Sequence, residues 1–165
     1  MPGTTVMTAA AFTRPADTTA YASGDLVANS TTAGSVAPIT VPLGAGPAQK
    51  GMIRRVSLVK SNTSATNAAF RVHFYTAAGT ITFANGDNGA WSTDRAANYL
   101  GYCDIAAMQA FTDGCSGQAA PAVGYEINFR LGASVAQVYA VLEARGAYTP
   151  ASGETFTLSV EAVLE

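Results

Sequence analysis

Alternation of apolar and polar residues near the C-terminus restricts the possible folds more than any other feature of the sequence. Within residues 155–164, TFTLSVEAVL, the alternate apolar positions are Phe156, Leu158, Val160, Ala162 and Leu164. Side chains two residues apart share one face of a β-strand, so this pattern predicts a strand with one buried face. Residues 125–131, YEINFRL, repeat the pattern. Half-buried strands of this kind are typical of antiparallel sheets that cover a core on one side.

Shorter segments along the chain also predict strands, at residues 9–14, 26–28, 36–43, 52–60, 69–76, 80–83 and 99–105. Residues 135–144 fit both helical and strand spacing, and their β-branched and aromatic residues favour a strand. Residues 106–111 predict a short helical turn, and residues 112–122, with Gly114, Gly117 and Pro121, predict a loop. About eight to ten short strands with regular turns predict an all-β fold, an antiparallel β-sandwich or jelly roll.

The length and the N-terminal composition predict the domain organisation. A chain of 165 residues corresponds to one domain. Residues 1–11 begin with small, unpatterned residues, so we expect a flexible N-terminal arm, followed by a single β-sandwich domain over residues 12–165. Residues 1–4 lack the basic start of a signal peptide, and no apolar stretch follows them. We therefore expect synthesis in a cytoplasm and no membrane partner.

Charge is scarce, with 12% charged residues and a formal net charge of −2. A chain without a basic patch has no electrostatic basis for binding nucleic acid. The low charge instead suits a protein that keeps much of its surface in contact with something else.

Residues 12–27, FTRPADTTAYASGDLV, predict a corner made of two turns. Pro15 favours an extended Arg14, and Asp and Thr side chains after it can bond nearby backbone groups. Tyr21 is a large amphipathic anchor, and Asp25 lies in the second turn before a new strand begins. The chemistry of the residues alone predicts a structural corner at Arg14, Pro15, Tyr21 and Asp25.

The same stretch carries a resemblance. Its pattern consists of Thr13, Arg14, Pro15, Thr18 or Thr19, Tyr21, Gly24, Asp25 and Val27. Together with residues 87–90 (DNGA), residues 98–102 (NYLGY) and the intervening region 53–75, it resembles small structural proteins of tailed-bacteriophage virions. The resemblance covers residues 12–106 in pieces and includes no catalytic motif. It implies a capsid decoration (cement) protein or a related head or tail component.

Catalytic motifs are absent from the sequence. His73 is the only histidine, and no serine or carboxylate is spaced to form a triad with it. No phosphate-binding glycine loop or nucleophile elbow is present. Four aspartates, Asp87, Asp94, Asp104 and Asp113, could in principle line the cleft of a small hydrolase. We predict no catalytic residue and no cofactor.

Metal and disulfide chemistry have little support. Residues 85–89, NGDNG, offer oxygen ligands for calcium, but loop formation explains them more simply, so we predict no metal site. Cys103 and Cys115 are expected to be free thiols in a reducing cytosol, and a disulfide between them stays open as an alternative.

Two groups of residues are candidates for interaction. Thr4, Thr5, Val6 and Met7 lie in the predicted arm, and Trp91, Tyr99 and Tyr102 gather in and beside a polar loop. Tryptophan and tyrosine are favoured in interfaces, although Trp91 could equally cap the sandwich core.

These observations and the resemblance together predict a non-enzymatic decoration protein on the capsid surface of a virion, assembled in the host cytoplasm. Its expected partners are the major capsid protein and further copies of itself, as a homotrimer or homodimer. The alternative is a carbohydrate-binding or receptor-binding module of a head or tail fibre. An exposed aromatic platform at Trp91 and Tyr102 would favour that alternative, whereas their burial at a subunit contact would favour the cement role.

Overall fold

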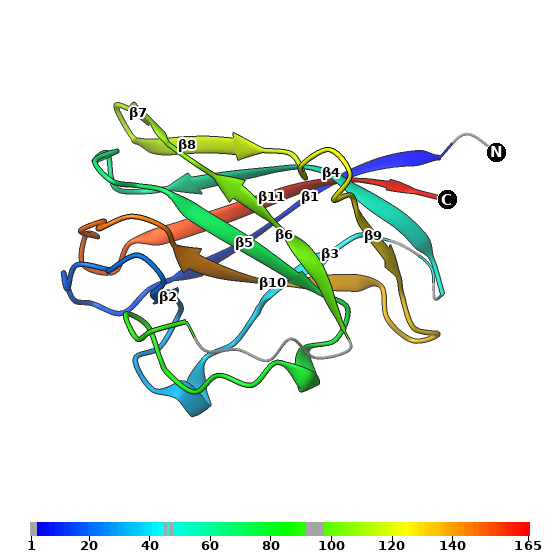
Figure 1. Cartoon of the computed structure of the whole chain (residues 1–165), viewed down its shortest axis with the longest axis horizontal. Coiled ribbons are helices and arrows are strands. Elements are labelled where there is room, and N and C mark those ends of the chain that lie inside the picture. Colours follow the sequence, from blue (N-terminus) through cyan, green and yellow to red (C-terminus); the bar gives the residue numbers. More distant parts are fainter. Residues whose placement is uncertain (1–2, 45, 47, 92–97) are drawn as a thin grey trace.

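A computed structural model of the chain describes residues 3–44, 46, 48–91 and 98–165. It contains two antiparallel sheets that face each other (Figure 1). The first has the order β1-β11-β4-β8-β7, and β9 also pairs with β4; the second has the order β2-β10-β5-β6, and β3 also pairs with β10. The prediction of an all-β antiparallel sandwich is confirmed.

Within residues 125–164 the bounds of the strands follow the alternation in the sequence closely. In chain order the strands are β1 (Thr4–Thr13), β2 (Leu26–Val27), β3 (Ile39–Pro42), β4 (Lys50–Lys60), β5 (Phe70–Tyr75), β6 (Tyr99–Ile105), β7 (Gln109–Phe111), β8 (Gly114–Ala119), β9 (Ile127–Arg130), β10 (Gln137–Ala144) and β11 (Thr155–Leu164). Two short 3-10 helices, Ala33–Ser35 and Ala78–Thr80, lie in the connections. Among the described residues, no helix is long and apolar enough to span a membrane.

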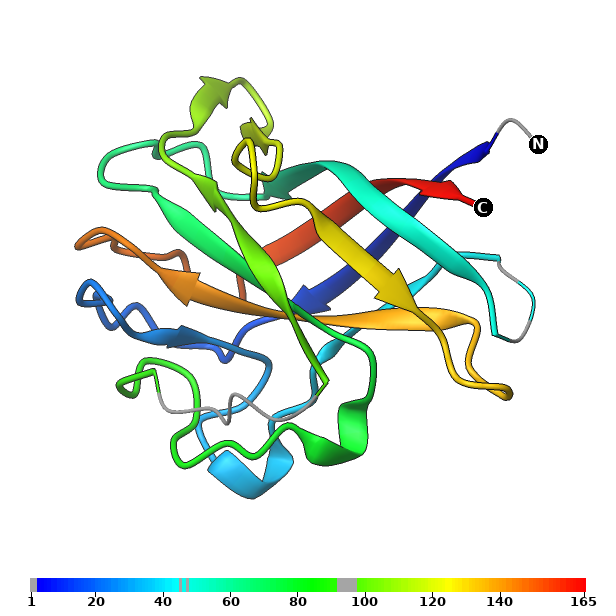
Figure 2. The same ribbon diagram turned by 45° about the vertical axis from the view of Figure 1, so that its right-hand side comes forward.

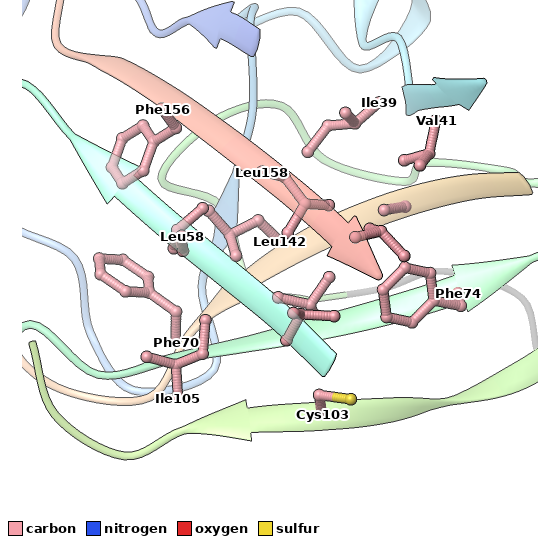
Figure 3. Packing of buried hydrophobic residues seen from close by; sticks show 14 of the residues in the cluster. Ile39, Val41, Leu58, Phe70, Phe74, Cys103, Ile105, Leu142, Phe156 and Leu158 are labelled. Carbon is pink, nitrogen blue, oxygen red and sulfur yellow. The ribbon is translucent and has the colours of Figure 1, made fainter. Parts of the chain in front are cut away.

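The core between the sheets is built around β11, which pairs with β1 on one side and β4 on the other. Phe156 and Leu158 of β11 are at most 1% exposed, as is Leu58 of β4. Figure 3 shows them facing side chains of the second sheet, which include Phe70, Phe74, Ile105 and Leu142. Phe70 packs edge-on against Phe156, with ring centroids 5.5 Å apart. The alternation in residues 155–164 therefore marks a central strand of the core.

The N-terminal segment differs from the predicted flexible arm. Residues 4–13 form β1, which pairs with β11 in unbroken register from Thr4 opposite Leu164 to Thr13 opposite Thr155. Figure 1 and Figure 2 show the start of β1 and the end of β11 side by side. Val6, Ala10 and Phe12 pack against the core, and this alternation is hard to recognise because small threonines and alanines separate the larger side chains.

Residues 106–122 also differ from the prediction, because β7 and β8 form a hairpin where a helical turn and a loop were expected. The glycines that indicated a loop are required by close packing. A Cβ atom on Gly117 would lie 2.5 Å from the Ile105 side chain, and one on Gly114 would lie 2.3 Å from the Lys60 carbonyl oxygen. The strand predicted at residues 80–83 is absent, since a 3-10 turn ends at Thr80 and an irregular segment follows.

A second, smaller apolar cluster lies on the outer face of the second sheet. It consists of Leu26, Ala28, Tyr75, Ile81 and Val141, with Trp91 and Tyr99 among the side chains packed against it. The connections that follow β2 and β5 lie together beside this sheet, on the side away from the first (Figure 1, Figure 2). They therefore cover part of a face that would otherwise be open to solvent.

Candidate functional site

The predicted corner is a buried network of charged and polar groups. Arg14 is 2% exposed, and its guanidinium donates to both Asp17 and Asp87 at 2.9 Å. Tyr21 donates to the other oxygen of Asp87 at 2.7 Å, and Ala28 N–H donates to that same oxygen at 2.8 Å. The Asp87 carboxylate is thus held by bonds from Arg14, Tyr21 and Ala28, which fix the corner against residues 85–89.

The remaining predicted corner residues contribute through shorter-range contacts. The Pro15 carbonyl accepts a bond from Arg14 at 3.3 Å. The Asp25 carboxylate accepts from Ala22 N–H at 2.6 Å, and the Asp25 backbone forms a bridge to Ala90. Two separate pieces of the recognised pattern, residues 13–27 and residues 87–90, therefore form one structural unit.

The aspartates considered for a hydrolase or calcium site lie in different surroundings. Both oxygens of Asp87 are used by the corner network, and Asp104 is paired with Arg71 on the outer face of the second sheet. Asp94 lies outside the described residues. Within the described ranges, no group of three metal-ligating side chains comes together. Cys103 and Cys115 are both buried free thiols, and burial raises the pKa of Cys103 to about 12.

The outer face of β5 and β6 carries a cluster that we call the β5–β6 face. Its members are Arg71, His73, Trp91, Tyr99, Tyr102, Asp104 and Glu143. Strand pairing aligns Glu143, Arg71 and Asp104 in one row across the sheet and places His73 beside Tyr102 in the next. Because alternate residues of a strand share a face, Arg71 and His73 both point outward while Val72 between them is in the core.

His73 is the centre of this face. Its Nε2 is 2.9 Å from a Glu143 carboxylate oxygen, and its Nδ1 is 3.1 Å from the Tyr99 hydroxyl. Trp91 stacks on the imidazole ring, with centroids 4.1 Å apart and planes 16° apart. Neutral imidazole satisfies both bonds, with Nε2–H donating to Glu143 and Nδ1 accepting from Tyr99. Trp91 thus covers a polar group on the outside of the sheet and does not cap the core between the sheets.

The charged groups of the β5–β6 face are paired, Arg71 with Asp104 and Glu143 with the neighbouring Arg145. Arg71 forms two bonds to Asp104, at 2.6 and 2.8 Å, and its guanidinium lies 3.8 Å from the centre of the Tyr102 ring. The hydrogen bond from Arg71 holds the pKa of Asp104 below its ordinary value. Burial acts to raise the pKa of Glu143, but bonds from His73 and Arg145 outweigh it and lower that pKa.

A groove with a volume of about 500 Å³ borders this face at the free edge of β6. It is lined by Tyr99, Leu100, Gly101, Tyr102, Ala122, Tyr125 and Glu126. Tyr102 is 46% exposed and Tyr125 is 79% exposed, so two aromatic rings are open to a ligand or partner. Among the described residues of the lining, Glu126 is the only charged one.

The structure brings together one of the two predicted interaction groups. Trp91, Tyr99 and Tyr102 all contact the His73 ring, whereas Thr4, Thr5, Val6 and Met7 lie on β1 in the other sheet. Tyr125 was missed as a site residue because its strand pattern indicated a core position. The pairing of His73 with Glu143 was also missed, because the two are 70 residues apart and only the sheet register joins them.

We expect the stability of the protein to fall as the pH falls below about 6.5, the ordinary pKa of histidine. Burial lowers the pKa of His73 in the folded protein, although the bond to Glu143 opposes this. The unfolded chain therefore binds a proton at a higher pH than the folded protein does, and stability rises with pH across this range. Thermal unfolding at pH 5 and pH 7.5 would measure the difference.

His73→Gln provides the matched variant for this test, because glutamine is polar and does not titrate. The variant should lose less stability than the wild type between pH 7.5 and pH 5. An equal loss in both proteins would show that another group controls the pH dependence.

Comparison with known proteins gives no family assignment. No protein-family model matches the sequence, and no curated protein matches it. Several solved structures show weak similarity over nearly the whole chain. The capsid asymmetric unit of cyanophage Pam1 is 9% identical, with 100% of this chain and 88% of that chain covered at a TM-score of 0.32.

The acid-stable capsid of Helicobacter pylori bacteriophage KHP30 is 12% identical, with coverage of 99% and 90% and a TM-score of 0.34. The PRD1 vertex protein P5 is 12% identical, with coverage of 93% and 95% and a TM-score of 0.35.

Proposed function

We propose that this protein is a structural component of a tailed-bacteriophage virion, and specifically a decoration protein that binds the outer capsid surface. In this role it bridges neighbouring subunits of the major capsid protein and adds contact area that stabilises the shell. It has no enzymatic activity, binds neither nucleic acid nor membrane, and joins the capsid in the host cytoplasm. The resemblance of residues 12–106 to virion proteins motivates the proposal.

The observation that supports this proposal most directly is an exposed apolar surface beside the groove, at Tyr102 and Tyr125. Both tyrosines line the groove, and Val123 precedes Tyr125 by two residues in the loop before β9. Val123 is 98% exposed. Single exposed apolar residues are ordinary, but a group of them beside a groove marks a surface that excludes water when a partner binds.

Binding to capsids that lack this protein tests the proposal. Co-sedimentation should saturate at a fixed ratio to the major capsid protein. Tyr125→Ala combined with Val123→Ser should weaken binding about tenfold or more, because truncating central aromatic residues of an interface costs more than about 1–2 kcal/mol. The control is Val59→Ser, which removes an exposed apolar side chain from the first sheet and should leave binding unchanged.

Failure of the wild-type protein to bind intact capsids would contradict the decoration role. Equal weakening by Val59→Ser and by the Tyr125 variant would contradict the assignment of the surface.

The alternative, a carbohydrate-binding or receptor-binding module, is favoured by one observation, the groove between Tyr102 and Tyr125. Open aromatic rings beside the carboxylate of Glu126 can cover the apolar face of a sugar ring and accept bonds from its hydroxyls. Saturable binding on a glycan array that Tyr125→Ala abolishes would support this function. A blank array, together with capsid binding, would exclude it as the main activity.

A further inference from the structure

Strand β1 is an edge of the six-stranded sheet, and its open side has a definite set of backbone groups. Arg14 N–H donates to the Glu154 carbonyl at 3.0 Å and so continues the β1–β11 register. Hydrogen-bonded pairs alternate along antiparallel strands, so the even-numbered residues of β1 bond to β11. The odd-numbered residues of β1 therefore direct their N–H and C=O groups outward. They are Thr5, Met7, Ala9, Ala11 and Thr13.

The pairing of β11 with β4, on the side away from β1, shows the same alternation of hydrogen-bonded residues. Ser61 N–H donates to the Thr155 carbonyl at 3.0 Å, so Thr155 bonds toward β4 and away from its β1 neighbour Thr13. In the part of the chain that the structure describes, no strand other than β11 pairs with β1.

The edge also lacks the features that usually protect exposed strands. Residues 4–13, TTVMTAAAFT, contain no charged residue and no proline, and their register with β11 has no bulge. By contrast, β3 on the corresponding edge of the second sheet ends at Pro42 and follows directly on Pro38. Natural proteins block open edges with charges, prolines or bulges, because an unblocked edge pairs with another strand.

We propose that β1 pairs antiparallel with β1 of a second copy of this chain, about a two-fold axis at Ala9. The outward-facing residues 5, 7, 9, 11 and 13 are centred on residue 9, so the register places Ala9 opposite Ala9 of the second copy. Met7 then lies opposite Ala11 of the second copy, and Thr5 lies opposite Thr13. Cross-strand neighbours of this kind stabilise a sheet, and a two-fold interface uses the same surface on both copies.

Charge and packing favour a second copy as the occupant. In a two-fold interface, a charge on one strand lies close to the same charge on its copy. Strand β1 carries no charged residue, so two copies of it do not repel each other. Met7 is 69% exposed, and the inward side of β1 is only half-buried at Val6 and Phe12. A groove of about 330 Å³ lies between Ala10, Ala11 and Phe12 of this edge and residues 37–40 at the start of β3. A second β1 covers these surfaces and extends the sheet across both copies.

Mass measurement in solution tests the pairing without any capsid, so its outcome is independent of the proposed function. The wild-type protein should have the mass of a dimer in light scattering. Ala9→Pro removes an outward N–H and leaves the bonds to β11 in place, so it should give a folded monomer. Ala9→Val keeps that N–H and should remain a dimer. A monomeric wild-type protein at high concentration, or a dimeric Ala9→Pro variant, would overturn the proposal.

Cysteine cross-linking tests the register. Residues opposite each other in a hydrogen-bonded antiparallel pair have Cα atoms about 5.5 Å apart, a distance that a disulfide spans. Ala9→Cys should therefore form a covalent dimer on mild oxidation. Thr5→Cys should not, because its two copies lie eight residues apart along the strands, about 26 Å.

Thr5→Cys combined with Thr13→Cys restores an opposed pair and should cross-link. The native thiols of Cys103 and Cys115 are buried and give no background. Equal cross-linking of the Ala9→Cys and Thr5→Cys variants would overturn the two-fold register.

Discussion

Asp87→Ala is expected to destabilise the protein by about 3–5 kcal/mol, the usual effect of removing one partner from a buried ion pair. The change leaves the Arg14 guanidinium in the interior without its buried counter-charge, since the side chains of both residues are fully buried. Tyr21 and the Ala28 N–H lose their acceptor at the same time. Denaturant unfolding, followed by tryptophan fluorescence and circular dichroism, measures the loss.

Asp17→Ala is the matched control, because Asp17 bonds the same guanidinium nitrogen at the same 2.9 Å but is 35% exposed. Exposed ion pairs contribute about 0–1 kcal/mol, so this variant should cost much less. Similar losses for both variants would show that burial does not control the strength of the network.

Replacement of both charges gives a second test of the same network. Burial raises the pKa of Asp87 although its carboxylate accepts three hydrogen bonds, which indicates that the desolvation of this carboxylate is not fully compensated. Arg14→Met combined with Asp87→Leu should therefore recover much of the stability lost in Asp87→Ala, because no lone charge is left in the interior. A double variant that is less stable than Asp87→Ala would contradict this account.

The sequence predicts the fold class well because alternation reports local geometry. Strands β5 and β11 have the predicted position and type because apolar side chains recur at every second residue, and β10 was predicted from its β-branched and aromatic residues. The first half of strand β1, before residue 9, was missed because its inward side chains are mostly small, and only pairing with β11 gives it structure. Strand β8 was missed because glycines usually mark loops, whereas here they permit close approach to neighbouring strands.

The candidate sites are harder to predict because their members are distant in the sequence. Arg14 and Asp87 are 73 residues apart, and His73 and Glu143 are 70 apart. Composition and spacing identify Trp91, Tyr99 and Tyr102 as an aromatic group, and the structure places them around His73. Which acid pairs with which base depends on sheet register, and no local pattern encodes that choice.

Glu154→Ala is expected to cost about 3–5 kcal/mol for the same physical reason, in a second buried network. Lys60 and Glu154 are both fully buried, with Lys60 Nζ 3.4 Å from a Glu154 oxygen. The Tyr148 hydroxyl lies between them, donating to Glu154 at 2.7 Å and accepting from Lys60 at 2.9 Å. Removal of Glu154 leaves the Lys60 ammonium without a counter-charge. Arg55→Ala breaks the exposed pair with Glu161 and serves as the control, with an expected loss below about 1 kcal/mol.

The two networks touch, so their losses should not be additive. The rings of Tyr21 and Tyr148 are parallel within 6° at 6.4 Å, and Tyr21 N–H donates to the Tyr148 carbonyl at 2.8 Å. Neighbouring sites that share partners show interaction energies of about 0.5–3 kcal/mol in double-mutant cycles.

Asp87→Ala combined with Glu154→Ala should therefore cost less than the sum of the two single losses, because the first change already loosens the tyrosine pair that the second depends on. Denaturant unfolding of the four proteins in the cycle measures this interaction energy. Strict additivity would mean that the contact between Tyr21 and Tyr148 does not couple the two networks energetically. Each charged pair would then stabilise the fold independently of the other.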